Sequence, residues 1–230
     1  KMMIIGGANH VLDSNLVYSE PHASTQVFDA ARPTEGWKPL APMPEPRLFP
    51  NVINLPDGTL LAVAGENKGV GVRSAALYDP ATDSWRTLAS QTETRRYHGT
   101  AILLADGRVL SGGDNYAGGG GDKLEIFSPP YLFRGPRPVI TGAPSKVYQG
   151  NSFTIGTNRP VARAVLVAPG ATTHSCDMNQ RHIELAFTTV DDGIKARVPN
   201  GNIAIRGHYM LFVLDGDGVP SVARWLKVSS

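Results

Sequence analysis

Short runs of alternating apolar and polar residues, separated by turn residues, make up most of the chain. Residues 56–67 (PDGTLLAVAGEN) and 105–115 (ADGRVLSGGDN) each contain an Asp-Gly pair, an apolar run and then small residues with glycine. A further apolar run, VINL or AILL, precedes each of them, so each predicts a β-hairpin closed by an Asp-Gly turn. No segment has apolar residues at a convincing helical spacing. The pattern therefore predicts an all-β protein.

These hairpins recur at a nearly constant step along the chain. Asp57 and Asp106 are 49 positions apart, and Trp37 and Trp85 are 48 apart, which fits the length of one blade of a β-propeller. The glycine pairs, aromatic strands and tryptophans resemble the kelch repeat. About three blades fit into residues 1–133, and we expect this segment to be an incomplete kelch-type propeller.

Two arginines, Arg47 and Arg96, stand just before the inner strands of two of these blades. A guanidinium group donates several hydrogen bonds in a fixed geometry. We therefore expect both residues to join neighbouring blades by donating to backbone carbonyl groups.

Three blades are too few to close a ring, which usually has four to eight. An open arc would expose long strand edges that favour aggregation. The opening residues KMMIIGG are typical of the middle of a strand rather than of a signal peptide. We therefore expect a further N-terminal portion of the propeller, in the same precursor or in a separate chain.

The pattern changes from about residue 134. The Pro-rich stretch RGPRPVITGAPS is followed by six or seven short alternating segments with turns between them. Strands of this length and spacing predict an immunoglobulin-like β-sandwich over residues 134–230. The last of them, HYMLFVLDGDGVPSVARWLKV, predicts a hairpin around Asp-Gly.

Composition narrows the partners. Hydrophobic residues make up 41% of the 230 residues. The formal net charge is only +2, so positive and negative side chains are too balanced for nucleic acid or an anionic membrane to be the main partner. No apolar run approaches the length of a membrane-spanning helix. Cys176 is the single cysteine, and we expect a small buried thiol there rather than a fourth metal ligand.

The candidate chemistry lies in an adjacent Tyr97-His98 pair, in RRYHGTAILL, and in His174, in PGATTHSCDMNQRHIEL. Adjacent residues of a regular strand point to opposite faces, so this pair can serve one metal only where a bend at the start of the strand re-aims one ring. One phenol oxygen and two imidazoles suit copper(II) better than a structural zinc site. The three residues are therefore candidate copper ligands.

These motifs, together with the kelch-like blades, IFSPPYLF and HYMLFVLDGDGVPSVARWLKV, resemble the copper-radical oxidases, the group of galactose oxidase and glyoxal oxidase. The resemblance covers the family's last blades and its C-terminal sandwich. It implies that Tyr97 is the axial tyrosine that takes the proton of the substrate hydroxyl, and that His98 and His174 are the histidine ligands. Phe49, in PRLFPN, falls at an aromatic position that lines the family's substrate pocket.

The resemblance also implies a reaction. A primary alcohol, aldehyde hydrate or sugar would be oxidised while O2 is reduced to H2O2. The resemblance also implies an extracellular or cell-surface location. The family's redox cofactor, a tyrosine cross-linked to a cysteine, lies N-terminal to the matched region, so we expect it outside this chain. The alternative hypothesis is a non-catalytic kelch propeller that binds a glycan or a protein, because one fold hosts both kinds of function.

Overall fold

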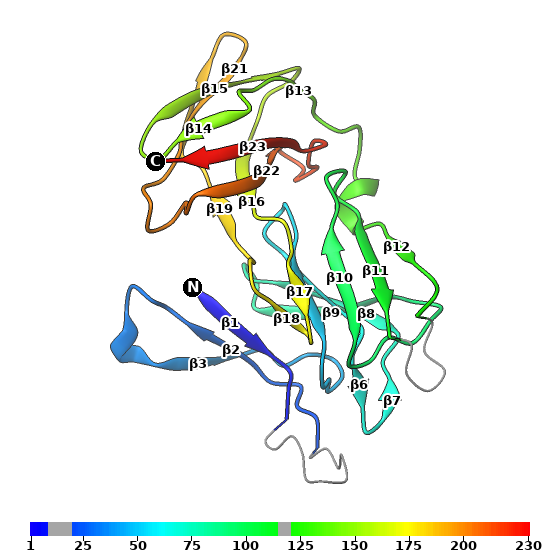
Figure 1. Ribbon diagram of the computed structural model, residues 1–230. Helices are drawn as coiled ribbons and strands as arrows, with labels where there is room; N and C mark the ends of the chain where they lie inside the picture. Colours follow the sequence, from blue (N-terminus) through cyan, green and yellow to red (C-terminus); the bar gives the residue numbers. More distant parts are fainter. Residues whose placement is uncertain (9–19, 115–120) are drawn as a thin grey trace.

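The computed structural model describes residues 1–8, 20–114 and 121–230, and this part of the chain is built almost entirely of strands (Figure 1). Three blade-like sheets come first. The first contains β1 (Met2–Ile5), β2 (Thr25–Phe28) and β3 (Trp37–Leu40), with the short helix η1 (Pro33–Glu35) between the last two. The second contains β4 (Asn51–Asn54), β5 (Leu60–Val63), β8 (Ser74–Asp79) and β9 (Ser84–Ser90), and the third contains β10 (Gly99–Leu103), β11 (Val109–Gly113) and β12 (Glu125–Phe127).

The remaining strands form the sandwich and two small hairpins. One sandwich sheet has the order β13 (Ile140–Gly142), β15 (Ser152–Thr157), β21 (Gly193–Arg197), β20 (Phe187–Val190). The other has the order β14 (Lys146–Tyr148), β23 (Arg224–Ser229), β22 (Gly207–Leu214), β16 (Arg163–Val167), β19 (His182–Glu184). The small hairpins are β6 (Glu66–Asn67) with β7 (Val70–Gly71) and β17 (Thr172–Thr173) with β18 (Cys176–Asp177), and helix η2 (Pro130–Phe133) precedes the sandwich. The predicted fold class, propeller blades followed by an immunoglobulin-like sandwich, is confirmed.

The Asp-Gly turns are where the sequence pattern predicted them. In the second blade, Leu55 N–H donates to the carbonyl of Thr59 at 2.9 Å, and the Asp57 carboxylate accepts from Thr59 N–H at 3.1 Å. Gly58 has a φ of 85° and Gly107, at the same place in the third blade, has a φ of 83°. This left-handed conformation favours glycine, which explains why the Asp-Gly pair recurs.

Arg47 joins the first two blades, as the sequence predicted. Its buried guanidinium donates to the carbonyl of Ala64 at 3.2 Å in the second blade. Its own carbonyl accepts from the N–H of Gly7 at 2.9 Å in the first. One residue thus connects both sheets, and burial lowers the pKa of its guanidinium to about 10.

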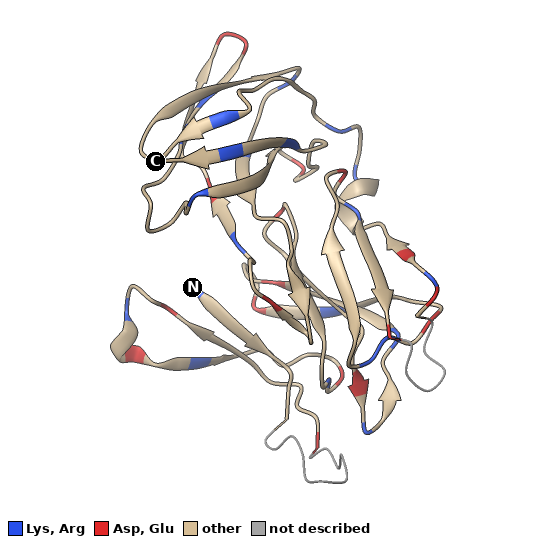
Figure 2. Cartoon of the chain, viewed as in Figure 1, with Lys and Arg blue, Asp and Glu red and all other residues tan. Residues whose placement is uncertain are grey.

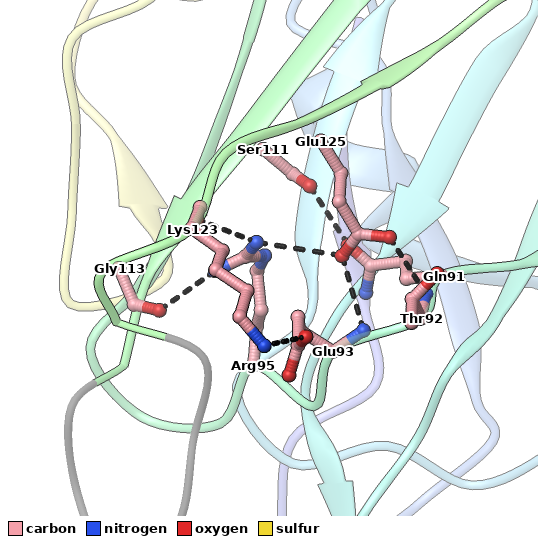
Figure 3. Close-up of polar contacts among 8 residues, drawn as sticks. All are labelled: Gln91, Thr92, Glu93, Arg95, Ser111, Gly113, Lys123 and Glu125. Atoms are coloured by element: carbon pink, nitrogen blue, oxygen red, sulfur yellow. Dashed lines mark hydrogen bonds and ion pairs between the residues drawn. The ribbon is translucent and has the colours of Figure 1, made fainter.

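The buried arginine at the corresponding place in the third blade is Arg95, the neighbour of Arg96. The Arg95 guanidinium is buried and donates to the carbonyl of Gly113 at 2.9 Å (Figure 3). The backbone carbonyl of Arg95 accepts from Gly65 N–H at 2.8 Å. Arg96 Nε lies 3.6 Å from the carboxylate of Asp114. The chain turns directly after Arg95, so its neighbour points to a different group.

The central strands of the five-stranded sheet are buried on both faces. On β22, Tyr209, Leu211 and Val213 belong to the core between the two sandwich sheets. The alternate residues Met210 and Phe212 belong to a second core, shared with the second and third blades. The apolar run in this strand is therefore continuous because the sheet closes the sandwich on one side and packs on the blades on the other.

Lys and Arg residues are interspersed with Asp and Glu along both parts of the chain (Figure 2), in keeping with the small net charge. Across the residues that the structure describes, no helix has the length and apolar character needed to span a bilayer.

Candidate metal centre

Tyr97 and His98 lie in a turn, not in a regular strand. The turn is closed by a hydrogen bond from Gly99 N–H to the carbonyl of Arg96 at 2.9 Å, and β10 begins directly after it. The two neighbouring rings therefore lie on the same side, with centroids 4.4 Å apart and planes inclined by 35°. The bend on which the sequence argument depended is present.

The residues at the end of β11 contact the backbone of His98. Asp114 N–H donates to the carbonyl of His98 at 3.2 Å. Gly113 has a φ of 81°, and a Cβ atom there would lie only 2.5 Å from the same carbonyl oxygen. Only glycine allows this close approach, so Gly113 helps to set the position of His98.

A buried acidic group fixes the start of the turn. The carboxylate of Asp114 is almost fully buried and accepts from the backbone N–H of Arg96 at 2.6 Å. Glu66 is buried nearby, and burial raises the pKa of its carboxyl group, although Arg96 acts in the opposite direction and Asp114 in the same one. The turn that carries the Tyr-His pair thus rests on buried carboxyl groups.

His174 lies at the tip of the β17–β18 hairpin, which leaves the sandwich and runs beside β10 (Figure 1). Its two-residue turn is formed by His174 and Ser175, with φ angles of 51° and 61°. Left-handed conformation at both central positions is typical of a tight hairpin turn of type I′. The turn projects the imidazole of His174 beyond the end of both strands.

Two hydrogen bonds attach this hairpin to the propeller. Near its base, the Thr172 hydroxyl donates to the carbonyl of Ala101 on β10 at 3.3 Å. At its tip, the Ser175 hydroxyl donates to the carbonyl of Phe49 at 2.9 Å. The hairpin is therefore held against the inner strands of two different blades.

The segment after the hairpin is attached as well. The side-chain amide of Gln180 donates to the carbonyl of Val52 on β4 and accepts from the amide of Asn54 at 3.2 Å. His182, on β19, has Nε2 at 3.2 Å from the carbonyl of Pro56, which only accepts, so Nε2 is the donor. Both contacts bind the sandwich to the β4–β5 hairpin.

These attachments bring four aromatic rings together. The centroid of His174 lies 5.3 Å from that of His98 and 5.5 Å from that of Tyr97. The ring of Phe49 lies 4.6 Å from that of Tyr97 at an angle of 53°. All four residues named from the sequence, which come from the two blades and the sandwich, thus lie in one cluster.

The donor atoms of the cluster suit copper(II). His174 Nδ1 lies 2.7 Å from the hydroxyl of Thr173, which leaves Nε2 available, and a ligating histidine usually has its other nitrogen hydrogen-bonded in this way. Among the described residues, no group of three or more His, Cys, Asp or Glu side chains is placed to hold a metal ion. A metal here would therefore depend on the phenol oxygen of Tyr97 with two imidazoles, a mixed nitrogen and oxygen set.

The environment of Cys176 differs from the expectation of a buried thiol. The side chain is exposed and its Sγ lies 3.9 Å from Sδ of Met178. The strands β17 and β18 have two residues each, and no second layer covers this side of so short a hairpin.

Sequence reasoning gave no role to Ser175, Gln180 or Asn54. Each belongs to a contact between positions more than 100 apart in the chain, and no local pattern reports such a contact. The only signal was their place in or beside the motif THSCDMNQR, or in the β4 strand.

Two family models and several known proteins are similar to this chain. The family model for the glyoxal oxidase N-terminus matches residues 1–131, and that for the galactose oxidase-like early set domain matches residues 137–228. A galactose oxidase of Gibberella zeae is 31% identical over 200 residues, covering 80% of this chain and 29% of the relative. An aldehyde oxidase of Vitis pseudoreticulata is 35% identical over 242 residues, covering 90% of this chain and 46% of the relative.

A solved structure agrees with these relatives. A fungal alcohol oxidase in complex with copper superposes with a TM-score of 0.86 at 29% identity, over 99% of this chain and 51% of that one. The chain thus spans less than half the length of these two curated relatives and about half of the solved one.

Proposed function

We propose that this chain, which belongs to the glyoxal oxidase family, is the C-terminal part of a copper-dependent oxidase. The protein would oxidise a primary alcohol or an aldehyde and reduce O2 to H2O2. The observation that carries the proposal is the position of His174, whose ring centroid lies within 5.5 Å of those of Tyr97 and His98 although it comes from a distant segment.

Copper would be held by Tyr97, His98 and His174. When bound, it supplies a Lewis acid for the substrate oxygen and a store for one electron. The relatives include copper enzymes by name, since the solved alcohol oxidase is in complex with copper. The cross-linked Tyr-Cys radical cofactor is proposed to lie N-terminal to this segment, because Cys176 is the only cysteine in the chain.

Tyr97 would act as the general base. The residue is 40% exposed, so Tyr97 lies at the surface of the described chain. The phenolate oxygen would take the proton from the substrate hydroxyl, breaking that O–H bond and forming the O–H bond of Tyr97. The complete reaction removes two electrons and two protons from the alcohol, and O2 takes them up as H2O2.

Phe49 would form one wall of the substrate site. Its ring packs against the ring of Tyr97, so an alkyl or sugar carbon bound beside the base would contact this apolar surface. Hydrophobic contact of this kind favours binding without taking part in proton transfer.

We propose that residues 1–133 form propeller blades and residues 134–230 the sandwich, and that further blades pack against the first sheet. Met2, Ile4 and Trp37 of that sheet are 54%, 52% and 43% exposed. Met2 and Ile4 lie on β1 and Trp37 lies on β3, the two outer strands of the sheet, and exposed apolar side chains of this kind are typical of a surface covered by another layer. We also propose an extracellular location, which rests on membership of the family.

The test uses the full-length protein. Copper titration should show one tight site, and a peroxide assay with simple alcohols and aldehydes should show turnover. His174→Ala should lose tight copper binding, while His208→Ala, an exposed histidine on β22, should keep it. Full copper occupancy in both His98→Ala and His174→Ala would remove the cluster from the metal site, and copper binding without peroxide formation would contradict the oxidase.

A further inference from the structure

The hydrogen bond from Ser175 to Phe49 joins the sandwich hairpin to the segment that precedes β4. Ser175 follows His174 directly in the hairpin turn, and its hydroxyl donates to the backbone carbonyl of Phe49 at 2.9 Å. The ring of Phe49 in turn contacts Tyr97. This bond therefore joins the loop that carries one candidate ligand to the residue that packs on another.

Both partners of this bond have an unfavourable backbone conformation. Ser175 has a φ of 61° and Phe49 a φ of 58°, the left-handed region, which residues other than glycine rarely adopt and a bulky residue least of all. Such conformations persist only where the surroundings impose them, and they concentrate at functional sites.

The segment around Phe49 is held from the propeller side as well. Leu48 and Glu66 exchange two backbone hydrogen bonds of 2.8 Å each. Gly65 packs so closely that a Cβ atom there would lie 2.7 Å from the carbonyl oxygen of Leu48. The backbone before Phe49 is thus fixed by its own blade, whereas the carbonyl of Phe49 is held by the sandwich hairpin.

We infer that Ser175 is a positioning residue that sets His174 and Phe49 as one unit. This inference rests on the proposed function, because it gives His174 the role of ligand and Phe49 that of pocket wall. The Ser175 hydroxyl acts through its neighbours: it fixes the direction in which the turn presents His174, and it fixes the backbone that directs the Phe49 ring onto Tyr97.

Ser175→Gly separates this role from simple turn formation. Glycine favours the left-handed conformation at this turn position, so the hairpin itself should form at least as well. The hydroxyl, however, is lost. A residue needed only to make the turn would tolerate glycine, whereas a positioning residue would not.

The experiment measures copper(II) affinity of the full-length protein by competition with a chelator, and records the copper(II) electron paramagnetic resonance spectrum. We expect Ser175→Gly to weaken copper binding about five-fold, the effect of one net hydrogen bond, to shift the copper hyperfine splitting, and to raise KM more than it lowers kcat. Thr172→Val removes the other hairpin bond, the one to Ala101, and should change affinity less than two-fold with an unchanged spectrum.

Three results would overturn the inference. Wild-type affinity and spectrum in Ser175→Gly would show that the hydroxyl positions nothing, and equal effects of Ser175→Gly and Thr172→Val would show only general attachment of the hairpin. Failure of the wild-type protein to bind copper through His98 and His174 would instead refute the proposed function, and the inference with it. Thermal unfolding of the copper-free variants checks that both fold.

Discussion

His98 and His174 are 76 positions apart in the sequence, yet their ring centroids lie 5.3 Å apart with the planes inclined by 83°. His98 is set by the turn before β10, and His174 by a tight turn at the end of the β17–β18 hairpin. The nearly perpendicular planes mean that the two rings meet edge to face and are not stacked. The four predictions below follow from this arrangement and its supports, and all apply to the full-length protein.

Tyr97→Phe removes the phenol oxygen and keeps the ring that packs on Phe49. We expect kcat for peroxide formation to fall by about 10²- to 10⁴-fold, the usual effect of losing a general base, while the two histidines still retain copper more weakly. Steady-state kinetics and metal analysis measure the two effects. Tyr148→Phe, an exposed tyrosine on β14, is the control, and near wild-type kcat in Tyr97→Phe would contradict the role of base.

Phe49→Leu removes the aromatic contact with Tyr97 but keeps an apolar side chain. We expect KM to rise by about 2- to 10-fold, because an aromatic pair contributes about 0.5–1.5 kcal/mol beyond its buried area. Kinetics with several alcohols and aldehydes provide the measurement. Phe133→Leu, which changes an exposed residue of η2, should leave KM unchanged; equal KM in both variants and the wild type would exclude Phe49 from the pocket.

Gly113→Ala should displace His98. The new Cβ would meet the carbonyl oxygen of His98 at 2.5 Å, and alanine at a positive φ itself costs about 1 kcal/mol. Gly69→Ala is the matched control, since its φ is 79° but nothing lies within 4 Å of the added carbon. Chemical unfolding should show a larger loss of stability for Gly113→Ala, accompanied by weaker copper binding. Equal losses would mean that the close approach to His98 is relieved without consequence.

His182 should make the attachment of the sandwich sensitive to acid. Burial lowers the pKa of its imidazole below the usual 6.5, although the hydrogen bond to Pro56 opposes the shift; Arg163 lowers this pKa as well, and Glu184 and Asp57 raise it. Because the unfolded chain then binds the proton more tightly, the stabilising contribution is complete above pH 6.5 and is lost as the pH falls from there through the lower pKa of the folded state.

The thermal midpoint should therefore be lower at pH 5.5 than at pH 7.5. His182→Gln keeps a donor for the carbonyl of Pro56 but does not titrate in this range, so its midpoint should change less between the two pH values. The same decrease in His182→Gln and in the wild type would assign the pH dependence to other groups.

Much of the fold was predictable because its signals are local. An Asp-Gly pair between two apolar runs is sufficient to predict a hairpin, since the turn geometry depends on the two residues themselves, and Gly58 and Gly107 show the expected positive φ. Which of the two neighbouring arginines is buried was not predictable in the same way. Arg95 and Arg96 are neighbours of the same type, and only the turn that begins after Arg95 decides which guanidinium is buried.

The amino-acid sequence by itself determined that the chain is all-β, where its hairpins turn, and which side chains could supply nitrogen and oxygen donors. Only the tertiary structure decided that Tyr97, His98, His174 and Phe49 form one cluster, that Cys176 is exposed, and that Ser175 reaches the carbonyl of Phe49. The physical reason is that turns and strands follow from neighbouring residues, whereas this cluster depends on hydrogen bonds and packing between the sandwich and two blades, contacts that exist only when distant segments are already folded against each other.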